Sequence, residues 1–268
     1  MPKFAANLTM LFNEVDFLDR FDAAAKAGFR GVEYLFPYAN DKNQLADRLK
    51  TLKLTQVLHN LPAGDWAAGD RGNACQPARV GEFQDGVGKA IDYATALGCK
   101  QVNCLAGIAP KDAAPDALRK TFVENLRFAA GKLKAAGIKL LIEPINTFDI
   151  PGFYLSRSAQ ALEIMSDVGS DNLFLQYDVY HMQRMEGELA ASLKKNLSRI
   201  AHIQIADNPG RNEPGTGEIN YPFLFKHIDQ IGYDGWIGCE YKPATTTVAG
   251  LGWAATYSVA LNYPGEQS

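Results

Sequence analysis

Short apolar runs alternate along the chain with longer segments in which apolar residues recur every three or four positions. The short runs predict buried β-strands, and the recurring spacing predicts amphipathic α-helices. Gly98, Gly137 and Gly169 each stand where a helical pattern ends and the next apolar run begins, as is common at helix C-termini. This regular alternation of helix and strand predicts a parallel α/β fold.

The pattern predicts about eight strands, near residues 4–10, 31–36, 54–61, 101–106, 139–143, 173–178, 200–205 and 235–241. Helices are predicted near residues 13–28, 42–51, 77–98, 115–137, 161–169, 186–198 and 220–232, with caps at Asn13 and Asn220. The length of 268 residues favours one domain, a (β/α)8 TIM barrel over 1–268. The barrel proper would span about 4–242, and a closing helix and tail would follow over about 243–268. An open doubly wound sheet is the alternative, because periodicity does not prove closure.

The composition narrows the class of partner. A net charge of −3 and an isoelectric point near 5.8 argue against a nucleic-acid surface, so a small-molecule substrate is expected. No apolar run reaches the roughly 20 residues of a membrane span, and the N-terminus lacks a signal-peptide core, which predicts a cytoplasmic protein. The four cysteines show no C-x-x-C spacing and are expected to be reduced, buried thiols. Homo-oligomerisation is left open.

Oxygen-bearing side chains recur at the ends of four predicted strands: Glu143, Asp178, Gln204 and Glu240. In a parallel barrel the carboxyl ends of the strands build the active site, so we expect these four side chains to meet. Three carboxylates at one point need a cation or protons to compensate them, and this hard ligand set suits Mg²⁺ or Mn²⁺. Taken singly, each residue would more often be a cap or a solvated strand edge.

Two of these residues carry the predicted chemistry. Glu143 and Glu240 would face each other across the barrel mouth, where one removes a proton from carbon and the other returns a proton to the neighbouring carbon. The chain has no Walker loop, no dinucleotide fingerprint and no G-x-S-x-G elbow.

Candidate substrate ligands lie nearby in the predicted topology. His181 is expected on the loop after the sixth strand, Asn60 ends the third, Arg211 lies in the loop after the seventh, and Lys242 follows the eighth. The alternative for each is a solvated loop residue without a role in binding. The long loop 62–72, with Trp66, is predicted to be a lid or a packing anchor. His202 is expected to be a hydrogen-bonded core histidine.

Several stretches resemble the hydroxypyruvate isomerase family of the xylose-isomerase-like barrel superfamily. They are Phe4-Ala-Ala-Asn-Leu, Leu58-His-Asn-Leu-Pro-Ala-Gly-Asp-Trp66, Ile142-Glu-Pro-Ile-Asn146, Gln176-Tyr-Asp-Val-Tyr-His-Met182, Glu213-Pro-Gly-Thr-Gly-Glu-Ile-Asn220 and Gly238-Cys-Glu-Tyr-Lys-Pro243. The resemblance implies a (β/α)8 barrel that interconverts hydroxypyruvate and 2-hydroxy-3-oxopropanoate (tartronate semialdehyde).

The same resemblance assigns roles to individual positions. It implies that Glu143 and Glu240 are the acid/base pair, and that Glu143, Asp178, Gln204 and Glu240 are the metal positions. Related epimerases commonly place histidine where this chain has Gln204, a weaker ligand, so the metal could be loosely held or dispensable.

Four alternatives stand beside this interpretation. A 2-oxo-tetronate isomerase would catalyse the same carbonyl shift on a substrate one carbon longer, and a ketose epimerase would share the barrel. A metal-dependent nuclease is disfavoured by the acidic chain and its four histidines. A non-catalytic sugar-acid binder would bind without turnover.

Overall fold

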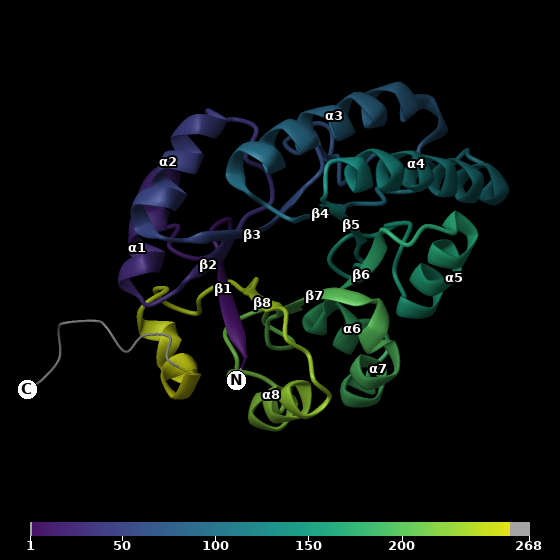
Figure 1. Cartoon of the computed structure of the whole chain (residues 1–268). Coiled ribbons are helices and arrows are strands. Elements are labelled where there is room, and N and C mark those ends of the chain that lie inside the picture. The colour runs from purple at the N-terminus through teal and green to yellow at the C-terminus, as the bar shows by residue number, and fades with distance from the viewer. Residues whose placement is uncertain (1, 258–268) are drawn as a thin grey trace, which may run out of the picture.

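A computed structural model describes residues 2–257 of the chain. Eight parallel strands close into one barrel in sequence order, and the helices surround it (Figure 1). The strands are β1 (Lys3–Asn7), β2 (Gly31–Glu33), β3 (Thr55–Asn60), β4 (Gln101–Cys104), β5 (Lys139–Ile142), β6 (Leu173–Asp178), β7 (Ile200–Ile205) and β8 (Trp236–Cys239). The α-helices are α1 (Arg20–Lys26), α2 (Lys42–Leu52), α3 (Val80–Leu97), α4 (Pro115–Ala135), α5 (Ser158–Val168), α6 (Val179–Met185), α7 (Leu189–Asn196) and α8 (Tyr221–Gln230).

Closure depends on the pairing of the first and last strands. In β1, Phe4 pairs with Ile237 of β8, while Asn7 pairs with Glu33 of β2 on the other side. This continuous ring of parallel pairs confirms the barrel and excludes the open sheet.

The helices form where the apolar spacing predicted them. In α3 the buried face includes Phe83, Val87 and Ala94, and Gly98 ends the helix in the left-handed region with φ 65°. The side chain of Asn220 accepts a hydrogen bond from the backbone N–H of Phe223 and caps α8, as predicted.

Several boundaries differ from the prediction. Asn13 caps no helix: a 3₁₀ turn over Phe17–Asp19 precedes α1, and the N-cap of α1 is Asp19. The predicted helix 186–198 is interrupted, because α7 ends at Asn196 and a 3₁₀ turn covers Leu197–Arg199. Helix α6 was not predicted, since it starts directly after the strand that ends in Asp178 and leaves no linker to mark it.

The end of the described chain packs against the outer face of β1 and against α8 as a 3₁₀ segment (Ala249–Tyr257) rather than an α-helix. Its Trp253 ring packs edge-on against the Phe4 ring of β1, with 5.0 Å between centroids, and its centroid lies 5.7 Å from that of Phe225 in α8. Residues 258–268, the remainder of the predicted closing helix and tail, lie outside the described residues. A further 3₁₀ turn, Pro77–Arg79, precedes α3.

The interior contains a main apolar core and a smaller cluster of Ala5, Val57, Leu58 and Leu141. All four cysteines are buried free thiols, as expected. Among residues 2–257, no helix is both long enough and apolar enough to cross a bilayer.

Candidate active site

Three of the predicted carboxylates meet at the carboxyl ends of the strands. Glu143 follows β5, Asp178 ends β6 and Glu240 follows β8. One oxygen of each, together with a ring nitrogen of His181, lies within 4.8 Å of the others. All four side chains are buried. The structure therefore gathers groups that lie almost one hundred positions apart in sequence.

His181 lies in α6 and not on the expected loop. The carboxylate of Asp178 caps this helix and accepts the backbone N–H of His181 at 3.1 Å. The ring is thereby turned inward, with Nε2 at 3.8 Å from Glu143 Oε1 and 3.9 Å from Asp178 Oδ2.

The tautomer of His181 follows from its neighbour Asn146. Asn146 Oδ1 accepts the backbone N–H groups of Phe148 and Asp149, which directs Asn146 Nδ2 toward His181 Nδ1 at 2.7 Å. Nδ1 is therefore the acceptor, and the ring proton resides on Nε2. Burial, and then the charges of Arg211 and Arg184, hold the His181 pKa well below its ordinary value. His181 is thus a neutral hydrogen-bond donor facing the carboxylates.

Burial dominates the electrostatics of the carboxylate cluster. It raises the pKa of Glu143 well above the ordinary value, and the charges of Glu240 and Asp178 raise it further. Burial likewise raises the pKa of Asp178, and it raises that of Glu240 to about 8, although Arg211 opposes the shift at Glu240. Burial therefore favours the protonated form of all three carboxyls, and the charge of Arg211 opposes this effect at each of them.

The partners of each carboxylate differ. Glu143 Oε2 accepts from Asn103 Nδ2 at 2.9 Å, and Glu240 Oε2 accepts from Arg211 Nη2 at 2.8 Å. Asp178 Oδ2 is buried and has no hydrogen-bond partner among the described residues. Three close carboxylates, one with an oxygen left unpaired, form a donor set that suits a hard divalent cation. The cluster thus fits the predicted metal site.

Gln204, the fourth predicted ligand, lies beside Asp178 in the register of β6 and β7. Its Nε2 donates to Glu33 Oε1 at 2.7 Å, and its Oε1 accepts from Gln176 Nε2 at 2.6 Å. Metal ligation would therefore require Oε1 to exchange its bond with Gln176 for the ion. Gln204 stays a predicted ligand.

A cavity of about 90 Å³ opens onto the cluster. Its lining includes five of the predicted site residues and several apolar side chains: Met10, Leu35, Asn60, Trp66, Leu105, Glu143, Ile145, Ile150, His181, Arg211 and Glu240. Lys242 does not line this cavity: the residue is exposed, and its backbone N–H and C=O bond to Arg211 and Asn212 of the neighbouring loop. The structure thus brings Asn60, His181 and Arg211 to the cavity but leaves Lys242 outside.

Arg211 lies in the predicted loop after β7, and this loop is held by an anchor that the sequence analysis did not identify. Asp207, just after β7, accepts backbone N–H groups from Asn208, Gly215, Gly217 and Ile219 at 2.8–3.1 Å. The guanidinium of Arg211 lies 5.2 Å from the ring of Tyr180 and close to Glu240. An aspartate directly after an apolar strand and before a glycine-rich loop is the one sequence signal that could have identified this anchor.

Trp66, in the long loop predicted to be a lid or a packing anchor, is a packing anchor that also lines the cavity. Its ring lines the cavity, packs 5.2 Å from Phe36 and lies 4.1 Å beneath the guanidinium of Arg71. Asp70 pairs with Arg79 at 2.8 Å and ties the loop to the start of α3. Trp66 is therefore both a packed anchor and part of the cavity wall.

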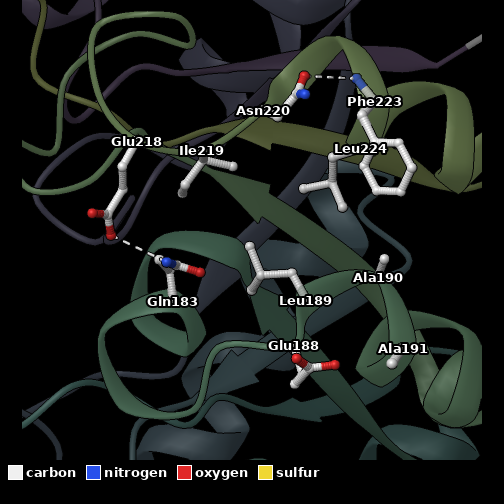
Figure 2. Close-up of a pocket in the computed structure, with 10 residues that line it drawn as sticks. All are labelled: Gln183, Glu188, Leu189, Ala190, Ala191, Glu218, Ile219, Asn220, Phe223 and Leu224. Carbon is white, nitrogen blue, oxygen red and sulfur yellow. Dashed lines mark hydrogen bonds between the residues drawn. The ribbon is translucent and has the colours of Figure 1, made fainter.

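A second hollow of about 270 Å³ lies on the outer surface, between α6, α7 and the start of α8 (Figure 2). Gln183 donates to Glu218 at 3.1 Å across it, and the remaining wall is largely Leu189, Ile219 and Leu224. None of the predicted site residues lines this hollow. The chemistry is therefore placed in the smaller cavity at the barrel mouth.

Comparison with known proteins agrees with this geometry. Residues 21–257 match the family model described as the xylose isomerase-like TIM barrel. The chain is 58% identical over 257 residues to hydroxypyruvate isomerase of Escherichia coli K12, covering 96% of this chain and 100% of that protein. It is 51% identical over 257 residues to a 2-oxo-tetronate isomerase of Cupriavidus necator, covering 96% and 99%.

A solved structure of similar length superposes closely. It is the crystal structure of a protein described as AP endonuclease, family 2, from Brucella melitensis, with a TM-score of 0.94, 47% identity and coverage of 96% and 99%. The chain therefore belongs to the hydroxypyruvate isomerase and 2-oxo-tetronate isomerase family of xylose isomerase-like TIM barrels, and it is an isomerase of the hydroxypyruvate isomerase type.

Proposed function

We propose that this isomerase interconverts hydroxypyruvate and 2-hydroxy-3-oxopropanoate. The observation that carries the proposal is the placement of Glu143 and Glu240 on one small cavity that also contains the guanidinium of Arg211. A small oxo-acid needs such a pair of proton-transfer groups and a cation for its carboxylate. The 58% identical relative in Escherichia coli is named for this substrate.

The reaction moves hydrogen between two adjacent carbons without net oxidation. A base removes one proton from the hydroxymethyl carbon of hydroxypyruvate, and the neighbouring carbonyl oxygen gains a proton, which gives an enediol. A proton then returns to the former carbonyl carbon while the other hydroxyl loses its proton and becomes the aldehyde. Atoms and electrons balance within the one substrate.

The hydrogen-bond partners of the two glutamates suggest which one starts. Glu240 bonds directly to the guanidinium of Arg211 at 2.8 Å, and this positive charge favours its ionised form. Glu143 bonds instead to the neutral amide of Asn103 at 2.9 Å, and burial and two carboxylate neighbours favour its protonated form. In the forward direction Glu240 therefore serves as the base and Glu143 as the acid.

The other residues of the cavity orient the substrate. The Nε2–H of His181 donates to the carbonyl oxygen, and Arg211 holds the carboxylate through guanidinium donors, of which Nε is buried and has no partner within residues 2–257. Asp178 and the two glutamates, with Gln204 as the predicted fourth ligand, would hold Mg²⁺ or Mn²⁺. When bound, such an ion would polarise the substrate oxygens.

The second candidate is 2-oxo-tetronate isomerisation, favoured by the name and 51% identity of the Cupriavidus necator relative. The same residues would perform the same carbonyl shift on a four-carbon acid. Chain length would then be limited by the apolar walls of the cavity, which Leu105, Ile145 and Ile150 provide.

A substrate panel tests the proposal. Purified protein is incubated with three- and four-carbon oxo-acids and with ketoses, with and without Mg²⁺ or Mn²⁺, and products are followed by NMR. We expect the highest kcat/KM with hydroxypyruvate. A higher value for 2-oxo-tetronate would favour the second candidate, binding without turnover would indicate a sugar-acid binder, and salt-dependent retardation of DNA would revive the nuclease hypothesis.

A further inference from the structure

A fully buried carboxylate, Glu33, lies beside the active site but does not line the cavity. Its Oε1 accepts from Asn7 Nδ2 at 3.0 Å and from Gln204 Nε2 at 2.7 Å, and its Oε2 accepts from His202 Nε2 at 2.7 Å. Glu33 is on β2, whereas Gln204 and His202 are on β7, with β1 and β8 between them in the ring. These side chains therefore meet across the barrel interior. We call Asn7, Glu33, His202 and Gln204 the Glu33 cluster.

Asn7 connects this cluster to Glu240. The same Asn7 Nδ2 that donates to Glu33 is 3.4 Å from Glu240 Oε1. Its orientation is fixed, because Asn7 Oδ1 accepts the backbone N–H of Thr9 at 3.1 Å. The amide has two N–H groups and can serve both carboxylates. Asn7 thus bridges Glu33 and Glu240.

Glu33 also packs against the backbone that precedes Glu240. A Cβ atom placed on Gly238, two residues earlier, would lie 2.3 Å from Glu33 Oε1. Only glycine leaves space for the carboxylate at this point. Glu33 therefore approaches the Glu240 segment both through Asn7 and through β8.

A buried carboxylate is costly to retain when it has no role in binding. We propose that Glu33 and Asn7 are positioning residues, which fix the carboxylate of Glu240 opposite Glu143 without touching the substrate. This inference rests on the proposed role of Glu240 as a proton-transfer group. The Arg211 contact fixes one oxygen of Glu240, Oε2, and the Asn7 bridge fixes the other, Oε1.

Conservative and truncating variants separate positioning from general support. In Glu33→Gln the amide oxygen can accept from Asn7 and Gln204 as before. The new NH₂ can donate to His202 Nε2 once the ring proton moves to Nδ1, an atom without a hydrogen-bond partner in the described structure. Glu33→Ala and Asn7→Ala instead break the bridge.

We expect Glu33→Ala and Asn7→Ala each to lower kcat roughly 10- to 100-fold, with KM changed far less, because small displacements of a reacting group have effects of this size. Glu33→Gln should stay within about threefold of the wild type, since its hydrogen bonds are retained. The double Ala variant should be about as slow as either single variant, because both remove one bridge. Gln56→Ala is the control: Gln56 is buried in β3, its side-chain Nε2 donates to the Leu58 carbonyl, and its Oε1 has no hydrogen-bond partner among residues 2–257, so kcat should not change.

Crystal structures of the same variants provide a readout that does not depend on turnover. The Glu240 carboxylate should leave its wild-type position in Glu33→Ala and Asn7→Ala, and keep it in Glu33→Gln and Gln56→Ala. An unmoved Glu240 in the Ala variants, additive losses in the double variant, or Glu33→Gln as slow as Glu33→Ala would each overturn the inference. If the wild type turned over no oxo-acid, the proposed function would fail, and the position of Glu240 would still decide the role of Glu33.

Discussion

Replacing Glu240 with glutamine should stabilise the metal-free protein, and the gain should grow with pH. The folded-state pKa of Glu240 is about 8 against an ordinary 4.5, mainly through burial. The stability contributed by the protonated carboxyl is complete below the ordinary value and is lost as pH rises through 8. That loss is about 2 kcal/mol at pH 6 and about 4 kcal/mol at pH 8. The amide introduced by Glu240→Gln does not titrate. The stability advantage of this variant over the wild type should therefore grow by about 2 kcal/mol from pH 6 to pH 8.

Urea unfolding of chelator-treated protein at pH 6 and pH 8 measures this difference, and in thermal unfolding it corresponds to roughly 5 °C. Glu124→Gln, on the exposed side of α4, is the matched control and should follow the wild type. Saturating Mg²⁺ or Mn²⁺ should remove the advantage of Glu240→Gln, because a bound cation favours the ionised carboxylate. If wild type and Glu240→Gln lose stability in parallel from pH 6 to pH 8, the reasoning about burial is wrong.

Three further variants, the last of them with a matched control, test separate parts of the site. Arg211→Met should raise KM for hydroxypyruvate roughly 10- to 100-fold. KM for dihydroxyacetone, which has no carboxylate, should rise less. An equal rise in both KM values would show that Arg211 does not bind the substrate carboxylate. Asn146→Asp should draw the His181 ring proton to Nδ1 and lower kcat/KM about tenfold. Imidazole ¹⁵N chemical shifts report which ring nitrogen carries the proton. A proton that stays on Nε2 in this variant would contradict the role given to Asn146. Gly238→Ala should destabilise the fold by about 1–3 kcal/mol, because the new methyl group collides with Glu33. Its control, Gly88→Ala, meets open space in α3 and should stabilise the fold by about 0.5–1 kcal/mol. A Gly238→Ala variant as stable as the wild type would show that Glu33 does not pack tightly against Gly238.

The barrel could be predicted from the sequence because several helices begin or end at a readable signal beside an apolar strand. Gly98 and the cap at Asn220 are examples that the structure confirms. Helix α6 escaped prediction because no linker separates it from β6, and Asp178 is at once the last strand residue and the helix cap. The strand lengths were overestimated since apolar residues continue into the loops above the barrel, as at Leu8 and Leu105.

Only some of the site residues could be predicted from the sequence. Glu143, Asp178 and Glu240 could be placed because a polar residue at the end of an apolar strand in a parallel barrel has one expected location. Asn7, Glu33 and Asn146 were missed, since their roles depend on contacts across the barrel or on the orientation of a neighbouring amide. Periodicity along one strand carries no information on such partners.

The central claim is that Glu143 and Glu240 together move a proton between adjacent carbons of one small oxo-acid. Incubation of wild type, Glu143→Gln and Glu240→Gln with hydroxypyruvate in D₂O, followed by NMR, tests it most directly. We expect the wild type to form 2-hydroxy-3-oxopropanoate with deuterium at the carbon that was the carbonyl, and each variant to lose at least about 100-fold in rate while remaining folded. Wild-type rates in either variant would contradict the account.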